Sequence, residues 1–226
     1  MVLNRKTVLL CGGLLLAVLG CQPSAEIHTD PEGFPLKING EDRGNAPIND
    51  FKFDFGQTPV YQISSSKPGY FDTTVKINQN SPELGAHKVV VKLPVDDAYN
   101  STVVAEGTND WVRMQVNPKF TYDQAWQRIV NSVTLRYQQL EQIDQKAGLI
   151  RSQPFSRDFS NPEHGKMTVH TRFIGSTATQ DPLVYQLQIE SKVSYGDKPD
   201  VWVDYPRVFK EDQALIDEIR QRLGVQ

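Results

Sequence analysis

From residue 34 to about residue 78, the chain alternates short apolar and polar stretches and has no helical periodicity. The alternating stretches are Leu36-Lys37-Ile38, Val60-Tyr61-Gln62-Ile63 and Thr74-Val75-Lys76-Ile77. They are separated by turn signals at Asn39-Gly40, Asn49-Asp50 and Lys67-Pro68-Gly69. A period of two residues bounded by such turns predicts β-strands. Residues 34–78 are therefore expected to form a small β-sandwich domain.

Residues 88–226 mix strand and helix periodicities. Strands are expected at 88–93 and 111–116, and two hairpins at 139–155 and 167–195, with a polar loop at 156–165. Apolar residues recur every three or four positions from Tyr122 to Tyr137, which predicts an amphipathic helix, and a second one is expected over 210–223. This order predicts an α+β, helix-grip-like fold in which an antiparallel sheet packs against two helices.

Two polar stretches separate these regions. Residues 21–33 are small and polar with Pro23 and Pro31, so they are expected to be a flexible tether. Residues 79–87 carry Pro82 and Gly85 and are expected to link a first domain (34–78) to a second (88–226).

The first 20 residues have the pattern of a secretory signal. Arg5 and Lys6 precede an apolar run over 8–19, which is shorter than the about 20 residues needed to span a bilayer. Val18-Leu19-Gly20-Cys21 resembles the bacterial lipobox. The resemblance implies cleavage between Gly20 and Cys21, and a diacylglycerol and an acyl chain on Cys21. The alternative is an ordinary signal peptide in which Cys21 stands by chance.

Processing at this position changes the composition. Loss of Arg5 and Lys6 leaves 22 basic against 27 acidic residues, a formal net charge of −5, so nucleic acid is not an expected partner. Cys11 leaves with the signal and Cys21 is acylated, so the mature chain is expected to have no free thiol and no disulfide. Gln22 follows Cys21, which by resemblance to a known sorting rule implies the outer membrane, facing the periplasm.

The first domain carries short family-like motifs. Ile38-Asn39-Gly40, Gly44-Asn45-Ala46-Pro47 and Lys67-Pro68-Gly69-Tyr70 together resemble the PEGA domain. Between them, Phe51, Phe53 and Phe55 alternate with charged residues. They are either strand core or an apolar partner-binding face.

The second domain also carries three family-like stretches: Val112-Arg113-Met114-Gln115-Val116, Asp123-Gln124-Ala125-Trp126 and Ile143-Asp144-Gln145-Lys146-Ala147-Gly148-Leu149-Ile150. Together they resemble BamC-type lipoproteins of the outer-membrane β-barrel assembly machinery. The resemblance implies a strand, a helix with an inward Trp, and a turn between two strands. Family members usually carry two such domains, and one is evident here.

No pattern for catalysis or metal binding stands out. His28, His87, His164 and His170 are scattered, and Asp96-Asp97 and Asp197 with Asp200 lie in expected turns. Nucleophile-elbow, zinc-protease, phosphate-loop and dinucleotide motifs are all missing from the sequence. The chain is therefore not expected to be an enzyme or to bind a cofactor or metal. A hydrolase would need a converging acid–base pair that the sequence spacing does not reveal.

Trp202 and Tyr205 lie in an aromatic stretch between two prolines, before the last helix. They either pack at a strand end or form an exposed patch for a protein or glycan. The expected function is a non-enzymatic, membrane-anchored adaptor that contacts an envelope protein during outer-membrane assembly or maintenance. The alternative is a lipoprotein that binds peptidoglycan or another envelope glycan.

Overall fold

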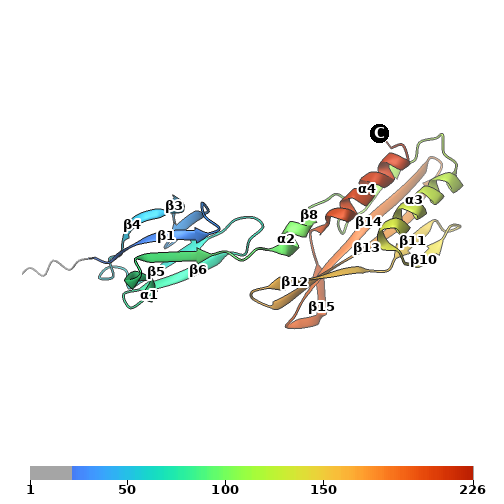
Figure 1. Cartoon of the computed structure of the whole chain (residues 1–226). Coiled ribbons are helices and arrows are strands. Elements are labelled where there is room, and N and C mark those ends of the chain that lie inside the picture. Colours follow the sequence, from blue (N-terminus) through green and yellow to red (C-terminus); the bar gives the residue numbers. More distant parts are fainter. Residues whose placement is uncertain (1–21, 226) are drawn as a thin grey trace, which may run out of the picture.

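The computed structural model describes residues 22–225, which form two units arranged end to end (Figure 1). The signal peptide and the lipidation and cleavage positions Gly20 and Cys21 lie outside the described residues. The fold is mixed α+β, as the sequence predicts, with a sandwich of sheets followed by a sheet that carries helices.

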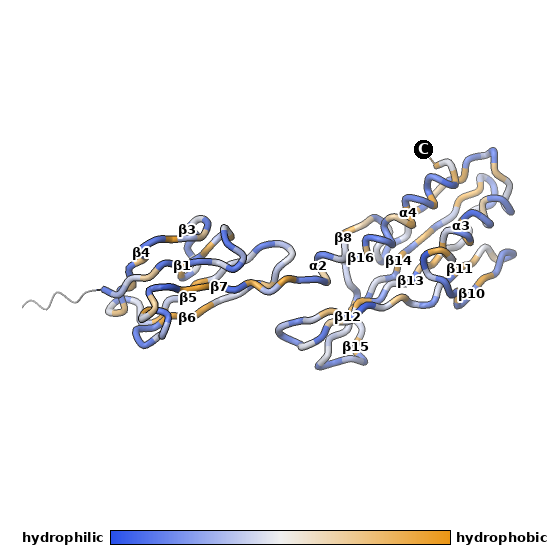
Figure 2. The backbone as a smooth tube through the Cα atoms, in the orientation of Figure 1, coloured by the Kyte–Doolittle hydropathy of each residue, from blue (hydrophilic) through white to orange (hydrophobic). Residues whose placement is uncertain are grey.

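The first unit consists of two sheets that face each other across one core. Its three-stranded sheet has the order β4-β1-β7 and its four-stranded sheet the order β3-β2-β5-β6. The strands and the short helix are β1 (Ser24–Asp30), β2 (Pro35–Ile38), β3 (Glu41–Asn45), β4 (Ile48–Lys52), β5 (Val60–Ser65), β6 (Thr73–Asn78), α1 (Pro82–Gly85) and β7 (Lys88–Lys92). Figure 2 shows the apolar stretch of β7 leading toward the second unit.

The tether prediction is wrong for most of residues 21–33, because Ser24–Asp30 form β1 at the centre of a sheet. Ala25, Ile27 and Thr29 point into the core and alternate with outward polar residues, and Ile27 is completely buried. Five of the seven residues of this strand are polar, so its composition resembles a tether. Its partner β7 runs parallel beside it, with Val89 opposite Ile27, and both residues belong to the core between the two sheets.

The expected linker and domain boundary also differ from the structure. Within residues 79–87, Pro82–Gly85 form α1, whose Leu84 packs into the first core. Strand β7, expected in the second domain, completes the first unit, and its core extends to Leu93. The connection to the second unit therefore starts after Leu93.

The turn predicted at Asn39-Gly40 is confirmed, whereas Asn49-Asp50, also predicted as a turn, lies inside β4. Asn39 and Gly40 both have positive φ, 53° and 84°, in the tight turn between β2 and β3. Phe53 is fully buried, and Phe51, Phe55 and Tyr61 pack their rings against it with centroids 4.9–5.6 Å away. The three phenylalanines thus form core and not an exposed binding face.

The second unit is a seven-stranded antiparallel sheet with two helices on one face. Strand order is β10-β11-β13-β14-β15, with β12 beside β13 and β9 beside β14. Its elements are α2 (Asp97–Ser101), β8 (Thr102–Val103), β9 (Val112–Gln115), α3 (Tyr122–Tyr137), β10 (Leu140–Asp144), β11 (Leu149–Ser152), β12 (Phe155–Asn161), β13 (Gly165–Gln180), β14 (Leu183–Tyr195), β15 (Lys198–Asp204), β16 (Val208–Phe209) and α4 (Lys210–Arg222).

Both predicted helices are confirmed. Thr121 and Gln124 cap α3 reciprocally, each side chain accepting a hydrogen bond from the other residue's backbone N–H. The inward stripe of α3 includes Trp126 and Ile129, and it packs with α4 over the sheet. The expected loop at 156–165 is wrong for residues 156–161, which belong to β12 (Phe155–Asn161). Arg157 lies on the same inner face as Phe155 and Phe159, and this charged residue hides the apolar alternation of the strand in the sequence.

Helix α2 contacts both units. Asn100 Nδ2 and the Asp96 backbone N–H donate to the Gly69 carbonyl of the first unit, at 3.0 and 2.9 Å. From the second unit, the Arg207 guanidinium stacks 3.9 Å above the Tyr99 ring and donates to the Thr102 carbonyl at 2.7 Å. These contacts attach the Lys67–Tyr70 turn of the first unit to the second unit.

Candidate functional site

The predicted aromatic residue Trp202 lies on β15, at the edge of the second sheet. Its side chain is partly open to solvent, with 39% of the residue exposed, and its neighbours Val201 and Val203 are 55% and 48% exposed. Three consecutive exposed apolar residues on one strand are unusual for a surface away from a contact site. Residues Val201, Trp202 and Val203 are called the β15 strip below; since side chains alternate along a strand, Val201 and Val203 lie on the opposite face from Trp202.

The pairing of β15 with β14 is irregular beside the strip. Val193 pairs with Val203 and Tyr195 pairs with Lys198, so two residues along β14 correspond to five residues along β15. Pro199 lies in this irregular stretch and has no N–H to donate. A bulge and a proline both make an edge strand a poor template for pairing with another strand. The strip therefore offers side chains, rather than free backbone, to a partner.

Trp202 rests on His170 of β13. The ring centroids are 4.2 Å apart and the rings are inclined by 33°. Burial lowers the pKa of His170 below its ordinary value, and the nearby cations Arg172 and Lys192 act in the same direction, against Glu190. The imidazole is thus held toward its neutral form, which suits an apolar contact with the indole.

Charged side chains cover the sheet beside this pair. Arg172 donates to both carboxylate oxygens of Glu190 at 2.8 and 2.9 Å and also contacts Glu141 at 3.4 Å. Burial opposes ionisation of Glu190, but Arg172 and Lys192 outweigh it and hold the pKa of the carboxyl below its usual range. Cross-strand ion pairs of this kind fix the open face of the sheet, which α3 and α4 do not cover.

Tyr205 does not join Trp202 in one surface patch. It packs with Phe209, Val169 and Val193 in a small core on the opposite face of the sheet from His170. Its hydroxyl lies 3.4 Å from Thr102 Oγ1, and burial raises the pKa of the phenol. Tyr205 therefore supports the strand, and Trp202 is the aromatic residue available to a partner.

The histidines lie in four separate places. His28 contacts Glu26 and Glu32, at 3.1 and 2.7 Å, and these hydrogen bonds raise its pKa. His164 lies 3.2 Å from Asp197, where two hairpin ends meet. Within the described residues, no three His, Cys, Asp or Glu side chains gather closely enough to hold a metal ion. Asp96, expected in a turn, caps α2 by accepting from the Tyr99 N–H at 2.8 Å.

One buried charge was not anticipated from the sequence. Asp212 in the first turn of α4 is completely buried, with Arg136 Nε 2.8 Å from one carboxylate oxygen and the Tyr137 hydroxyl donating to the same oxygen at 3.1 Å. Burial raises the pKa of Asp212, although Arg136 and the hydrogen bonds oppose this. The pattern of α4 gave no signal, because Asp212 precedes the apolar stripe of the helix in an otherwise polar first turn.

Comparisons with known proteins found no match to a protein-family model, a curated protein or a solved structure. The resemblances to the PEGA domain and to BamC-type lipoproteins therefore stay predictions. Within residues 22–225, no helix combines the length and the apolar composition needed to cross a bilayer.

Proposed function

We propose that the chain is a non-enzymatic adaptor of the cell envelope, anchored by lipid on Cys21, that binds an envelope protein through the β15 strip. The observation that carries this proposal is the exposure of Val201, Trp202 and Val203 on a strand whose backbone is protected from pairing. Large aromatic side chains are frequent binding hot spots because they bury much area with little loss of conformational freedom.

The proposed lipid anchor contributes to the adaptor function by holding the protein at the membrane. A lipid on Cys21 would confine the protein to the membrane surface, facing the periplasm from the outer membrane by the sorting resemblance. Confinement raises the effective concentration of the adaptor for neighbouring proteins without any new contact. The first unit would then act as a support that carries the second unit away from the bilayer, as the end-to-end arrangement suggests (Figure 1).

The test is photo-crosslinking in cells with the lipidated protein. A photoreactive amino acid at Trp202 should capture a discrete protein, whereas the same amino acid at Lys76, on the outer face of the first unit, should not. Trp202→Ala should abolish a complex captured from a neighbouring position and leave the melting temperature almost unchanged. A large loss of stability without selective loss of the partner would contradict the proposal.

The lipid anchor has its own test. Cys21→Ala should leave both units folded and release the protein from the membrane fraction. If the variant still sediments with membranes, the anchoring proposal is wrong.

An exposed indole also favours a second candidate, the binding of peptidoglycan or another envelope glycan, because sugars stack on aromatic rings. Co-sedimentation with purified cell-wall sacculi distinguishes the two candidates. Sedimentation that Trp202→Ala abolishes would support the glycan, and its absence together with a discrete crosslinked protein would support the adaptor.

A further inference from the structure

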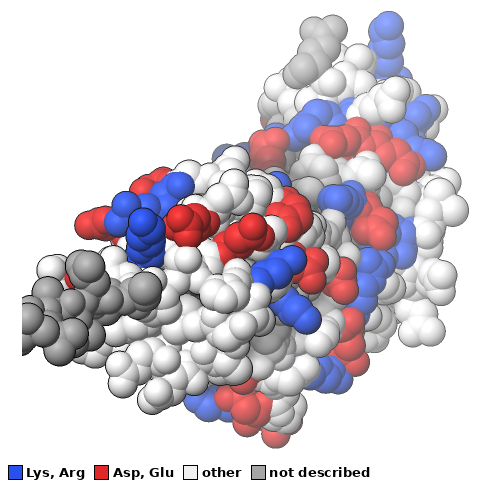
Figure 3. Space-filling model, turned by 60° about the vertical axis from the view of Figure 1, so that its left-hand side comes forward, with Lys and Arg blue, Asp and Glu red and all other residues white. Residues whose placement is uncertain are grey.

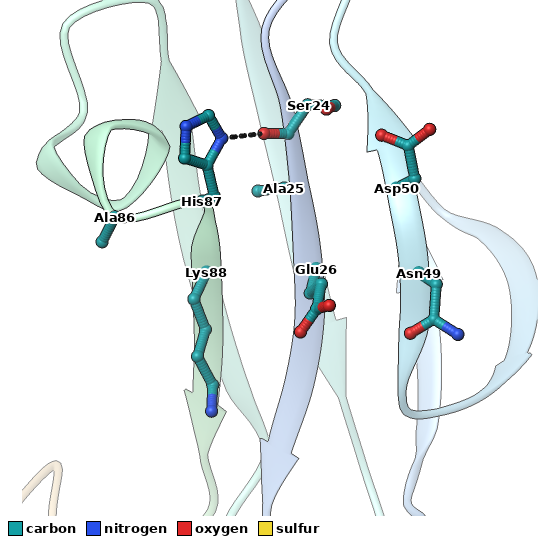
Figure 4. A pocket seen from close by; sticks show the side chains of 8 residues that line it. All are labelled: Ser24, Ala25, Glu26, Asn49, Asp50, Ala86, His87 and Lys88. Atoms are coloured by element: carbon teal, nitrogen blue, oxygen red, sulfur yellow. Dashed lines mark hydrogen bonds between the residues drawn. The ribbon is translucent and has the colours of Figure 1, made fainter.

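An open depression with both polar and apolar lining lies on the outer face of the β4-β1-β7 sheet, at the end of the first unit where the described chain begins. It has a volume of about 490 Å³ and is lined by Ser24, Glu26, Asn49, Asp50, His87 and Lys88 (Figure 4). The lining comes from three strands that are distant in sequence. This size lies within the range of small-ligand sites.

The backbone around the depression is unusual at two positions. Asp50 and His87 have positive φ, 49° and 53°, which is uncommon for residues other than glycine. Asp50 lies in a bulge, since Ala25 pairs with Phe51 and Ile27 with Ile48, so that Asn49 and Asp50 both face Glu26. Bulges and such backbone conformations concentrate at functional sites, where they redirect side chains.

His87 is held in this conformation by β1. Its carbonyl accepts a hydrogen bond from the Glu26 N–H at 3.0 Å, and its Nδ1 donates to the Ser24 carbonyl at 3.1 Å (Figure 4). With Nδ1 donating, the neutral ring presents Nε2 as an acceptor. The imidazole is exposed, and its hydrogen bond to Ser24 orients it in the wall of the depression.

The wall carries charges of both signs. Glu26 and Asp50 supply two carboxylates and Lys88 supplies an ammonium, and Glu26 and Lys88 are register partners on β1 and β7. His28 Nε2 already lies 3.1 Å from Glu26 Oε2, so a ligand would use the other oxygen, Oε1. Positive and negative side chains also lie side by side on the first-unit face seen in Figure 3. A complementary ligand would carry an ammonium group for the carboxylates and an anionic group for Lys88.

The chain length limits where this depression can lie. Cys21 precedes Ser24 by three residues, and an extended chain spans at most about 3.5 Å per residue, so the separation is at most about 10 Å. With a lipid on Cys21, the depression would open at the level of the phospholipid headgroups. A zwitterion dissolved in the periplasm would not be concentrated near the depression in this way, whereas headgroups beside the lipid anchor would be.

We infer that the depression binds the phosphoethanolamine headgroup of a membrane phospholipid. Glu26 accepts a hydrogen bond from the primary ammonium, Lys88 contacts the phosphate, and Asp50 adds negative charge at the edge of the depression (Figure 4). The inference rests on the proposed lipid anchor, which brings the headgroups within reach. A second membrane contact beside the lipid would orient the first unit and so direct the second unit away from the bilayer.

The test is an NMR titration of the mature full-length chain carrying Cys21→Ala, with glycerophosphoethanolamine as the probe. Backbone signals of Glu26, Asp50, His87 and Lys88 should shift and saturate in the millimolar range. Glycerophosphocholine should bind more weakly, since its quaternary ammonium has no N–H to donate. Absence of saturable shifts, or equal shifts with both probes, would overturn the inference.

Matched variants locate the binding. Lys88→Ala should weaken binding at least tenfold, whereas Lys92→Ala, which removes another exposed lysine from the same face of β7, should not. Glu26→Gln should remove the preference for ethanolamine over choline, with Asp30→Asn of the same strand as its control. An effect of Lys92→Ala equal to that of Lys88→Ala would mean nonspecific ionic binding. Because the titration uses neither the anchor nor a protein partner, its failure is distinguishable from failure of the adaptor proposal.

Discussion

The two units differ in how completely each buries its apolar surface. In the first, two sheets close on one core, and among residues 24–92 Val60 is the one large apolar side chain that is extensively exposed. In the second, helices cover one face of the sheet, and Trp111, Leu135, Ile143 and the β15 strip remain exposed. The first unit is thus complete by itself, while the second retains apolar groups that a partner can cover.

Architecture explains the difference. A sandwich turns the inner faces of both its sheets toward each other, so its outer faces can be polar throughout. A single sheet with helices on one side keeps an open face, and here Arg172, Glu190 and Glu141 stabilise that face by ion pairs. The support unit and the binding unit are therefore separable, and four substitutions test this separation.

The largest effect is expected from Ile27→Ala, which opens a cavity in the first core. The first unit should lose about 4 kcal/mol of unfolding free energy, as is typical for a fully buried Ile. All three tryptophans, Trp111, Trp126 and Trp202, lie in the second unit, so tryptophan fluorescence reports on that unit alone. Urea denaturation should show an earlier transition by circular dichroism and an unchanged fluorescence transition.

Val60→Ala is the control, because Val60 belongs to the same unit but is 44% exposed. If Ile27→Ala leaves both transitions unchanged, residues 24–30 are a tether after all. If it shifts both equally, the units do not unfold separately.

A slightly smaller loss is expected from Arg136→Met in the second unit. It leaves the Asp212 carboxylate buried without its cation, which should lower stability by about 3 kcal/mol at neutral pH. The pKa of Asp212 is already raised by burial, so folding favours its protonated form, and this contribution is lost as pH rises through the folded pKa. The defect should therefore shrink in acid, as measured by fluorescence-detected urea denaturation at several pH values.

Arg222→Met on the exposed side of α4 serves as the comparison for this substitution. Its partner Glu218 is solvated, so the change should stay within about 0.5 kcal/mol at every pH. A pH-independent defect in Arg136→Met would mean that lost packing, not the buried charge, is responsible.

Gly69→Ala should loosen the connection between the units. Gly69 has a φ of +89°, and an added Cβ would lie 2.6 Å from Asn100 Oδ1. Backbone strain alone should lower the stability of the first unit by roughly 1–2 kcal/mol. The collision should also separate the Lys67–Tyr70 turn from α2, which small-angle scattering would detect as a broader distribution of overall dimensions.

Gly40→Ala is the control for backbone strain, since Gly40 has a similar φ of +84° but nothing lies within 4 Å of the added Cβ. It should reduce stability similarly without changing the scattering. Identical scattering for the two variants would argue against α2 as the contact that joins the units.

The smallest effect on stability, under about 1 kcal/mol, is expected from Trp202→Ala. The substitution is expected to change the pKa of His170 more clearly than it changes stability. Burial now lowers the pKa of this imidazole, so its contribution to stability is present above pH 6.5 and is lost as pH falls. Uncovering the ring should raise its pKa toward the ordinary value, as followed by NMR, while the histidine signals of the first unit stay unchanged. An unaltered His170 titration would show that the indole does not shield it.

The sequence by itself determined the elements whose pattern is local. Helix α3 is set by the Thr121–Gln124 cap and its apolar stripe, and the β2–β3 turn by Asn39-Gly40. The long β13–β14 pair follows from its alternation. These features needed only neighbours in the chain, so the α+β class and the two helices could be predicted.

Tertiary structure alone decided which half-polar segments belong to a core and which aromatic residue stays outside. Strand β1 resembles a tether until the rest of the first unit packs around it, because Ile27 is buried in a core to which both sheets contribute. Likewise, Tyr205 turns inward and Trp202 outward because they lie on opposite faces of the sheet. Periodicity reports the side on which a residue lies, whereas the partner that covers that side is fixed only when distant strands pack together.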